Sequence, residues 1–167
     1  MNHKNIPRLL EAWQAVHRQY SGVRLVLAGR PKQGEGRVRE LIAARKLSAV
    51  VAVPGFVPDE LLAALYAEAR ALVFPSLYEG FGLPALEAQA AGVPVVASNI
   101  TSLPELLGSG AIYVNPESAQ DISRGLEAVL EDADLRAELA AAGRQSARRF
   151  TWIETARQHV AVYERLH

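Results

Sequence analysis

Short apolar runs alternate with amphipathic stretches along the chain as far as residue 117. The runs are apolar along their whole length, which is typical of strands buried on both faces of a parallel sheet. We expect these strands at 23–28, 49–53, 71–74, 93–97 and 112–114. Strands that alternate with helices predict an α/β protein with a Rossmann-like, doubly wound parallel sheet.

The stretches between the runs carry apolar residues three and four positions apart, which predicts helices. Leu9, Leu10, Trp13 and Val16 show this spacing in the stretch 6–20. Asp59 is a candidate N-cap for a later helix, whose apolar face would consist of Leu61, Leu62, Leu65 and Tyr66. We expect helices at 6–20, 35–46 and 59–70, one that begins near Pro84, and a short one opened by residues 102–105.

Beyond residue 117 the pattern is helical throughout, over 118–131, 134–148 and 151–166. These would be extra C-terminal helices added to the sheet domain. We expect Trp13, Trp152 and Tyr163 to lie in the core. A doubly wound domain usually opens with a strand, whereas this pattern opens with a helix, so either the chain is a fragment or an upstream segment supplies a strand.

Composition excludes several classes of protein. The 18 Lys and Arg residues balance 18 Asp and Glu residues, so no overall basic charge would attract nucleic acid. No apolar stretch approaches the roughly 20 residues that span a bilayer, so we expect no membrane insertion. The chain lacks cysteine, which excludes disulfides and thiolate chemistry and fits a cytoplasmic protein. The four histidines show no spacing typical of metal ligands.

In a doubly wound sheet, ligands bind beyond the carboxyl ends of the strands. The loop 74–87 is the most informative one, because a strand leads through two glycines, Gly80 and Gly82, into a helix. Glycines let backbone N–H groups approach a ligand closely, and a helix N-terminus favours an anion such as phosphate. Pro84 suits the first turn of the helix.

Two carboxylates, Glu79 and Glu87, flank this loop. Because a carboxylate repels phosphate, we expect both to accept hydrogen bonds from sugar hydroxyls instead. Such hydrogen bonds to charged groups contribute roughly 1.5–3 kcal/mol each. Arg30 and Lys32 follow another strand end, where they would either contact a diphosphate or remain solvated, and Ser76 would either contact ligand or shape the loop.

The letters of residues 80–85 also fit a glycine-x-glycine-x-x-alanine dinucleotide fingerprint between a strand and a helix. That fingerprint belongs on the first strand–helix turn and needs an acidic residue about 20 positions further on. Here it stands on a later turn, and residues 98–101 contain no acid. A dinucleotide-binding oxidoreductase fragment is therefore the weaker alternative.

Glu79 and Glu87 together form a glutamate-x7-glutamate motif that resembles that of retaining GT-B glycosyltransferases of group 1. Further segments resemble the family in the same order along nearly the whole chain, at 3–12, 25–29, 53–57, 92–98, 103–105, 135–136, Gly143 and 150–152. The resemblance implies one half of a GT-B fold, in which residues 1–167 form the domain that binds a UDP-, GDP- or ADP-type sugar.

The resemblance also implies roles for particular residues. Lys4 would neutralise the donor diphosphate, and Glu87 would bind the ribose hydroxyls. Glu79 would act as the catalytic-site residue that holds the donor sugar. The other positions expected to bind the donor are Arg30, Gly55, Phe56, Val57, Ser76, Gly80, Phe81, Gly82 and Leu83. The family needs no metal and no cofactor besides its donor substrate.

Family enzymes have two Rossmann-like domains, and this chain resembles only the second. The first strand of that domain, with the glycine and arginine that follow it, has no counterpart here, and neither has the N-terminal acceptor domain. We therefore expect the chain to be inactive alone and its last helix to be suited to docking on that partner domain. A stand-alone module that binds nucleotide sugars without catalysis is the alternative.

Overall fold

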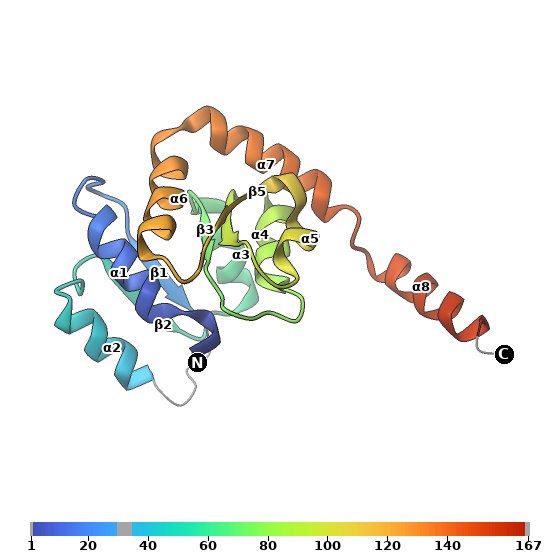
Figure 1. Ribbon diagram of the computed structural model, residues 1–167, viewed down its shortest axis with the longest axis horizontal. Helices are drawn as coiled ribbons and strands as arrows, with labels where there is room; N and C mark the ends of the chain where they lie inside the picture. Colours follow the sequence, from blue (N-terminus) through green and yellow to red (C-terminus); the bar gives the residue numbers. More distant parts are fainter. Residues whose placement is uncertain (1, 30–34, 166–167) are drawn as a thin grey trace.

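The computed structural model describes residues 2–29 and 35–165. Its strands are all parallel: β1 (Leu25–Ala28), β2 (Val51–Gly55), β3 (Leu72–Phe74), β4 (Val95–Ser98) and β5 (Ala111–Val114). Helices lie on both sides of these strands (Figure 1). The expected α/β class with parallel sheets is confirmed.

The strands form two sheets rather than the single sheet expected from the sequence. One has the order β1-β2 and the other the order β3-β4-β5. Leu25 and Val51 of the first sheet nevertheless share one hydrophobic cluster with Val96 and Val114 of the second. Among the described residues, β1 pairs only with β2, and β3 pairs only with β4. Each sheet therefore has an unpaired strand edge beside a common core.

The helices largely confirm the predicted order, with shifted ends. They are α1 (Ile6–Val16), α2 (Glu35–Ala44), α3 (Asp59–Glu68), α4 (Leu83–Ala91), α5 (Leu103–Leu107), α6 (Ala119–Glu131), α7 (Ala133–Ala147) and α8 (Trp152–Glu164). Short 3-10 turns cover Asn2–Lys4 and Gly108–Gly110. Helix α1 is shorter than the predicted 6–20, because the chain turns after Val16 and reaches Gly22 at φ 87°.

Strand β2 extends through Pro54 and Gly55, which we expected to stop it. A proline cannot donate to a neighbouring strand, but β2 pairs only with β1 among the described residues, so its outer edge tolerates the missing N–H. Strand β4 is buried at all four residues and bonds to strands on both sides. It therefore forms the centre of the larger sheet.

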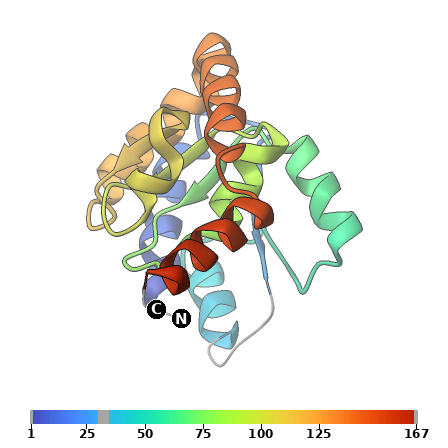
Figure 2. The same ribbon diagram turned by 90° about the vertical axis from the view of Figure 1, so that its right-hand side faces the viewer.

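Two expectations are wrong: the N-cap of α3, and the burial of the aromatic residues of α8. The N-cap of α3 is Pro58 rather than Asp59, and the helix has no buried residue, with Leu61 60% exposed. In Figure 2 this helix stands at the side of the molecule. Trp13 lies in the core as expected, at 2% exposure, but Trp152 is 86% exposed. An amphipathic pattern marks a face that can be buried, but it does not supply the surface that would cover it.

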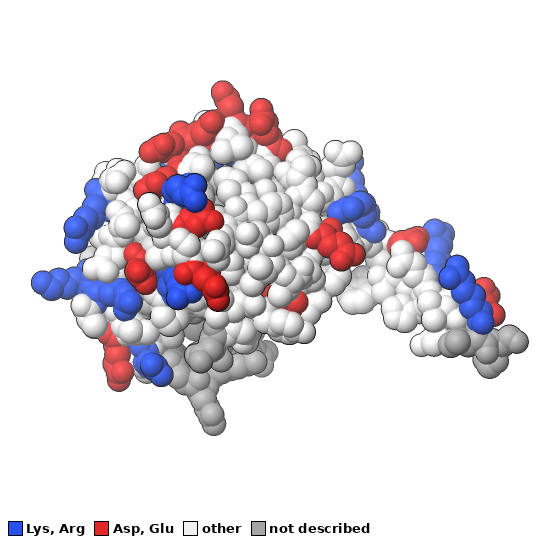
Figure 3. Space-filling model, viewed as in Figure 1, with Lys and Arg blue, Asp and Glu red and all other residues white. Residues whose placement is uncertain are grey.

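Tyr163, the third residue expected in the core, is also exposed, and α8 as a whole has no buried residue. The helix projects away from the rest of the molecule (Figure 1). Acidic side chains gather where α6 meets α7, while the remainder of the face shown in Figure 3 mixes both signs. Within residues 2–29 and 35–165, no helix is long and apolar enough to cross a membrane.

Candidate functional site

The loop between β3 and α4 depends on glycine at one of its two glycine positions. Gly82 is the N-cap of α4, with φ 109° and ψ 40°. A Cβ atom at Gly82 would lie 2.7 Å from Leu103 Cδ2. Gly80 faces open space, where an added Cβ meets no atom within 4 Å. Gly82 is therefore required by the loop itself, whereas Gly80 leaves room on the outer side of the loop.

The same loop leaves backbone donors available at the start of α4. The hydroxyl of Ser102 lies 3.1 Å from the Glu79 carbonyl oxygen and 3.0 Å from the Phe81 carbonyl oxygen, and its one proton is shared between them. The N–H groups of Phe81, Gly82 and Leu83 have no hydrogen-bond partner in the described part of the chain. Such free donors at a helix N-terminus can bind an anion. The carbonyl groups of Glu79 and Phe81 are thus bonded within the fold, and among the described residues the N–H groups of Phe81, Gly82 and Leu83 are free.

Lys4 and Glu79, 75 residues apart in sequence, meet at this loop. The Lys4 Nζ donates to Glu79 Oε1 at 2.7 Å, and the two side chains are 38% and 13% exposed. The ammonium also lies 4.4 Å from the centre of the Phe74 ring. The structure therefore brings a cation from the chain start to the glycine loop.

Glu87 stands one turn into α4 and is exposed. The Tyr66 hydroxyl, from α3, lies 3.3 Å from Glu87 Oε2 and 3.2 Å from the Pro84 carbonyl oxygen. Burial, followed by the charge and hydrogen bond of Glu87, raises the pKa of Tyr66 to about 12. We expected Tyr66 only as part of an apolar helix face, because spacing alone does not show that its hydroxyl reaches α4.

The remaining predicted residues are not all brought together. Gly55 ends β2 at φ 77°, with Phe56 55% exposed and Val57 beside it. This segment belongs to the β1-β2 sheet, which shares no strand pairing with β3. Ser76 is 1% exposed, and its Oγ is buried without a partner among the described residues. Arg30 and Lys32 lie outside the described residues.

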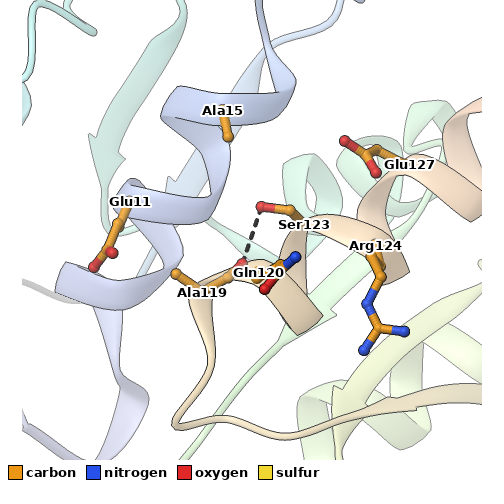
Figure 4. Close-up of a pocket in the computed structure, with 7 residues that line it drawn as sticks. All are labelled: Glu11, Ala15, Ala119, Gln120, Ser123, Arg124 and Glu127. Atoms are coloured by element: carbon orange, nitrogen blue, oxygen red, sulfur yellow. Dashed lines mark hydrogen bonds between the residues drawn. The ribbon is translucent and has the colours of Figure 1, made fainter.

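Within the described ranges, no group of three or more His, Asp or Glu side chains is placed to hold a metal ion. A groove of about 420 Å³ lies between α1 and α6 (Figure 4), and none of its lining residues belongs to the glycine loop. The one proton of its Ser123 hydroxyl is already shared between the Ala119 carbonyl oxygen at 2.9 Å and the Ala12 carbonyl oxygen at 3.2 Å. Its lining carries both acidic side chains, Glu11 and Glu127, and a basic one, Arg124, so neither sign of charge dominates to select a ligand.

Residues 1–146 match the model of the family described as glycosyl transferases group 1. The chain is 38% identical over 165 residues to the O-antigen chain mannosyltransferase B of Escherichia coli. That alignment covers 98% of this chain and 43% of the relative. The chain therefore spans less than half the length of this relative.

Solved structures show the same fold. The C-terminal domain of a glycosyl transferase group 1 family protein from Francisella tularensis is 26% identical with a TM-score of 0.79, and the match covers 89% of this chain and 80% of that one. Anabaena HepE in complex with UDP and glucose is 24% identical with a TM-score of 0.84. That match covers 98% of this chain and 45% of the other.

Proposed function

Because the chain belongs to the group 1 glycosyl transferases, we propose that it is the donor-binding half of such an enzyme and binds a nucleotide-diphosphate sugar. The observation that supports this most is the Lys4–Glu79 pair beside the free N–H groups of the glycine loop. It combines a cation and backbone donors for a diphosphate with a carboxylate for sugar hydroxyls. The family match also removes support from the dinucleotide-binding alternative.

In the proposed site, the diphosphate contacts Lys4 and the N–H groups of Phe81, Gly82 and Leu83. Glu79 accepts hydrogen bonds from the donor sugar, and Glu87 accepts them from the ribose. Tyr66 holds Glu87 from the side of α3. Gly55, Phe56 and Val57 would meet the nucleobase at the end of β2, where Phe56 offers an exposed ring. Arg30 and Ser76 remain candidate donor contacts.

We propose that the complete enzyme transfers the sugar with retention of configuration and without a metal. Negative charge develops on the leaving diphosphate as the sugar departs, so groups that stabilise this charge accelerate the reaction. Lys4 and the N-terminus of α4 supply positive potential at this position. HepE, with the same fold, is known in complex with UDP and glucose, which supports a nucleotide site of this kind.

Residues 1–167 are proposed to form one donor-binding domain that works with an acceptor-binding half outside this chain. Helices α1 and α2 contact each other and so lie on one face of the β1-β2 sheet. With right-handed crossovers, a strand before α1 would lie beside β1 on the side away from β2. That side and the unpaired edge of β3 offer a place for one further parallel strand.

The exposed apolar side chains of α8 are the proposed docking surface for the acceptor-binding half. They include Trp152 at 86% exposure, Ile153 at 68% and Tyr163 at 61%. A helix with this much exposed apolar surface, and no buried residue, gains stability when a partner covers it. The relative with 38% identity is more than twice as long as this chain, which leaves enough length for such a half.

Calorimetric titration tests the donor site, with UDP, GDP, ADP, their sugars and NAD as ligands. Mannosyl donors come first, because the relative from Escherichia coli is named a mannosyltransferase. We expect one nucleotide class to bind, with an affinity that chelators leave unchanged and that Glu87→Gln lowers about tenfold. The matched control Glu138→Gln removes an exposed carboxylate on α7 and should not change the affinity.

Tight binding of NAD with no binding of nucleotide sugars would contradict the proposal. Absence of binding to every nucleotide, in this chain and in the chain joined to its acceptor-binding half, would contradict it as well. Binding that appears only in the joined protein would show that residues outside this chain complete the site.

A further inference from the structure

Asn5, at the start of α1, has a backbone conformation that residues other than glycine seldom adopt. Its φ and ψ are 55° and 32°, and only 6% of the residue is exposed. Asparagine tolerates this left-handed region better than most side chains do. Asn5 is also the N-cap of α1, yet its side chain makes no capping hydrogen bond. The side chain therefore serves another purpose than starting the helix.

Both amide protons of Asn5 are used in tertiary hydrogen bonds. The Nδ2 atom donates to the Pro75 carbonyl oxygen at 3.1 Å and to the Pro116 carbonyl oxygen at 2.6 Å. Pro75 follows β3, and Pro116 lies just beyond β5. One buried side chain thus joins three segments that are far apart in the sequence: the start of α1 and the loops after two strands.

The residue before Asn5 is Lys4, whose ammonium is bonded to Glu79 in the loop after β3. A second bond joins the same two segments, from the Leu77 N–H to the His3 carbonyl oxygen at 2.7 Å. A lysine side chain has many rotamers, and holding it in one place costs entropy unless its backbone is already fixed. Asn5 fixes that backbone against the loop that carries Glu79.

We propose that Asn5 is a positioning residue for the diphosphate part of the donor, acting through Lys4. The proposal rests on the function proposed above, in which Lys4 meets the diphosphate. Asn5 holds the Lys4 ammonium beside Glu79 before the ligand arrives, so that little side-chain freedom is lost on binding. It acts on the diphosphate and not on the nucleoside, because Lys4 is the group that it places.

Chemical labelling of Lys4 tests the positioning without any ligand. The chain has three lysines, at positions 4, 32 and 46. Exposed Lys46 serves as the internal reference for acetylation measured by mass spectrometry. We expect Lys4 in the wild type to react several-fold more slowly than Lys46, because it is bonded to Glu79. Asn5→Gly and Asn5→Asp should remove that difference, as should Glu79→Gln.

Both Asn5 variants keep a residue that tolerates positive φ and lose the two donors, and their folding is checked by circular dichroism. Arg8→Ala is the matched control, because Arg8 Nη1 donates to the same Pro116 carbonyl oxygen at 3.3 Å. It should leave the labelling of Lys4 unchanged. Slow labelling of Lys4 in a folded Asn5 variant would overturn the proposal.

A double-mutant cycle measures the effect on binding. UDP, GDP and ADP are titrated beside uridine, guanosine and adenosine. Asn5→Gly should weaken the diphosphate about tenfold and the nucleoside less than about twofold. Lys4→Met should add little in the Asn5→Gly background. Equal losses for nucleoside and diphosphate, or full additivity with Lys4→Met, would overturn it.

The labelling and the titration together distinguish failure of the positioning role of Asn5 from failure of the proposed donor site. If no nucleotide binds the wild type or the joined protein, the proposed donor site fails, and with it the diphosphate role of Asn5. If nucleotides bind and labelling of Lys4 is unaffected by the Asn5 variants, the donor site stands and the positioning role fails.

Discussion

At the scale of single residues, the two glycines of the loop are there for different reasons. The fold itself requires glycine at position 82, whereas at position 80 only a ligand would require it. Gly82 combines a positive φ with a neighbour 2.7 Å from the position of an added Cβ. Gly80 has neither constraint within the chain. Sequence alone made the two glycines look equivalent, and only the backbone geometry distinguishes them.

We expect Gly82→Ala to lower the free energy of unfolding by about 2 kcal/mol, through backbone strain and the approach to Leu103. The matched variant Gly80→Ala should stay within about 0.5 kcal/mol of the wild type, while its nucleotide affinity falls. Urea unfolding measures both variants. Equal stability of the two would show that the loop adapts to a side chain at Gly82.

A second prediction at this scale concerns alkaline pH. The pKa of Tyr66 is raised from 10.0 to about 12, so the neutral phenol is favoured in the folded state. The resulting stability is present below pH 10 and is lost as the pH rises toward 12. Between pH 10 and pH 12, the free energy of unfolding of Tyr66→Phe should therefore fall by less than that of the wild type.

Ultraviolet absorbance of tyrosinate follows the same residue directly. Tyr66→Phe should remove one of the tyrosines that ionise near pH 12, and Glu87→Gln should move that ionisation to lower pH. Tyr20, whose pKa the Glu131 hydrogen bond and burial also raise to about 12, stays in both variants as a reference. An unchanged titration in Tyr66→Phe would refute the assignment.

At the scale of elements, the helices differ in how far they take part in the core. Helix α1 buries Leu9, Leu10, Ala12, Trp13 and Val16, whereas α3 and α8 bury no residue. The sequence predicted all three from the same kind of apolar spacing. Spacing shows where an apolar face lies, but a partner surface decides whether that face is buried.

Removal of residues 151–167 is therefore expected to change the free energy of unfolding of this chain by less than about 1 kcal/mol. Leu126→Ala, in a helix that packs on the core with Leu126 5% exposed, should cost about 2–5 kcal/mol and serves as the comparison. Thermal and urea unfolding measure both. A truncated chain as unstable as Leu126→Ala would mean that α8 packs on the body of the molecule.

At the scale of the whole molecule, the two sheets share a core, and within the described residues β1 and β3 each have one unpaired edge. Strand β4 has partners on both sides, and β1 has one among the described residues. Amide hydrogen exchange should therefore be much slower in β4 than in β1 and β3. In the chain joined to the proposed acceptor-binding half, exchange in β1 and β3 should slow while exchange in β4 changes little. Equal rates for β1 in both proteins would argue against a strand at this position.

The sequence predicted the class of fold and located the loop of the candidate site, but it did not predict all the contacts made there. The loop with Glu79, the glycines and Glu87 could be located because loop, strand and helix signals stand next to one another in the chain. The Lys4–Glu79 contact agrees with the predicted grouping at one site, although its pairing could not be read from residues 75 positions apart. Tyr66 and Asn5 escaped prediction, because their hydrogen bonds depend on how distant segments pack.

By itself the sequence determined the alternation of strands and helices, the class of fold and the loop that carries the candidate site, because each of these depends on local spacing and local backbone preference. Only the tertiary structure decided that the strands form two sheets, that α3 and α8 remain exposed, and that Asn5 ties Lys4 to the glycine loop. These features depend on the surfaces that meet across the fold, and the free energy of burial is gained only where two such surfaces come together.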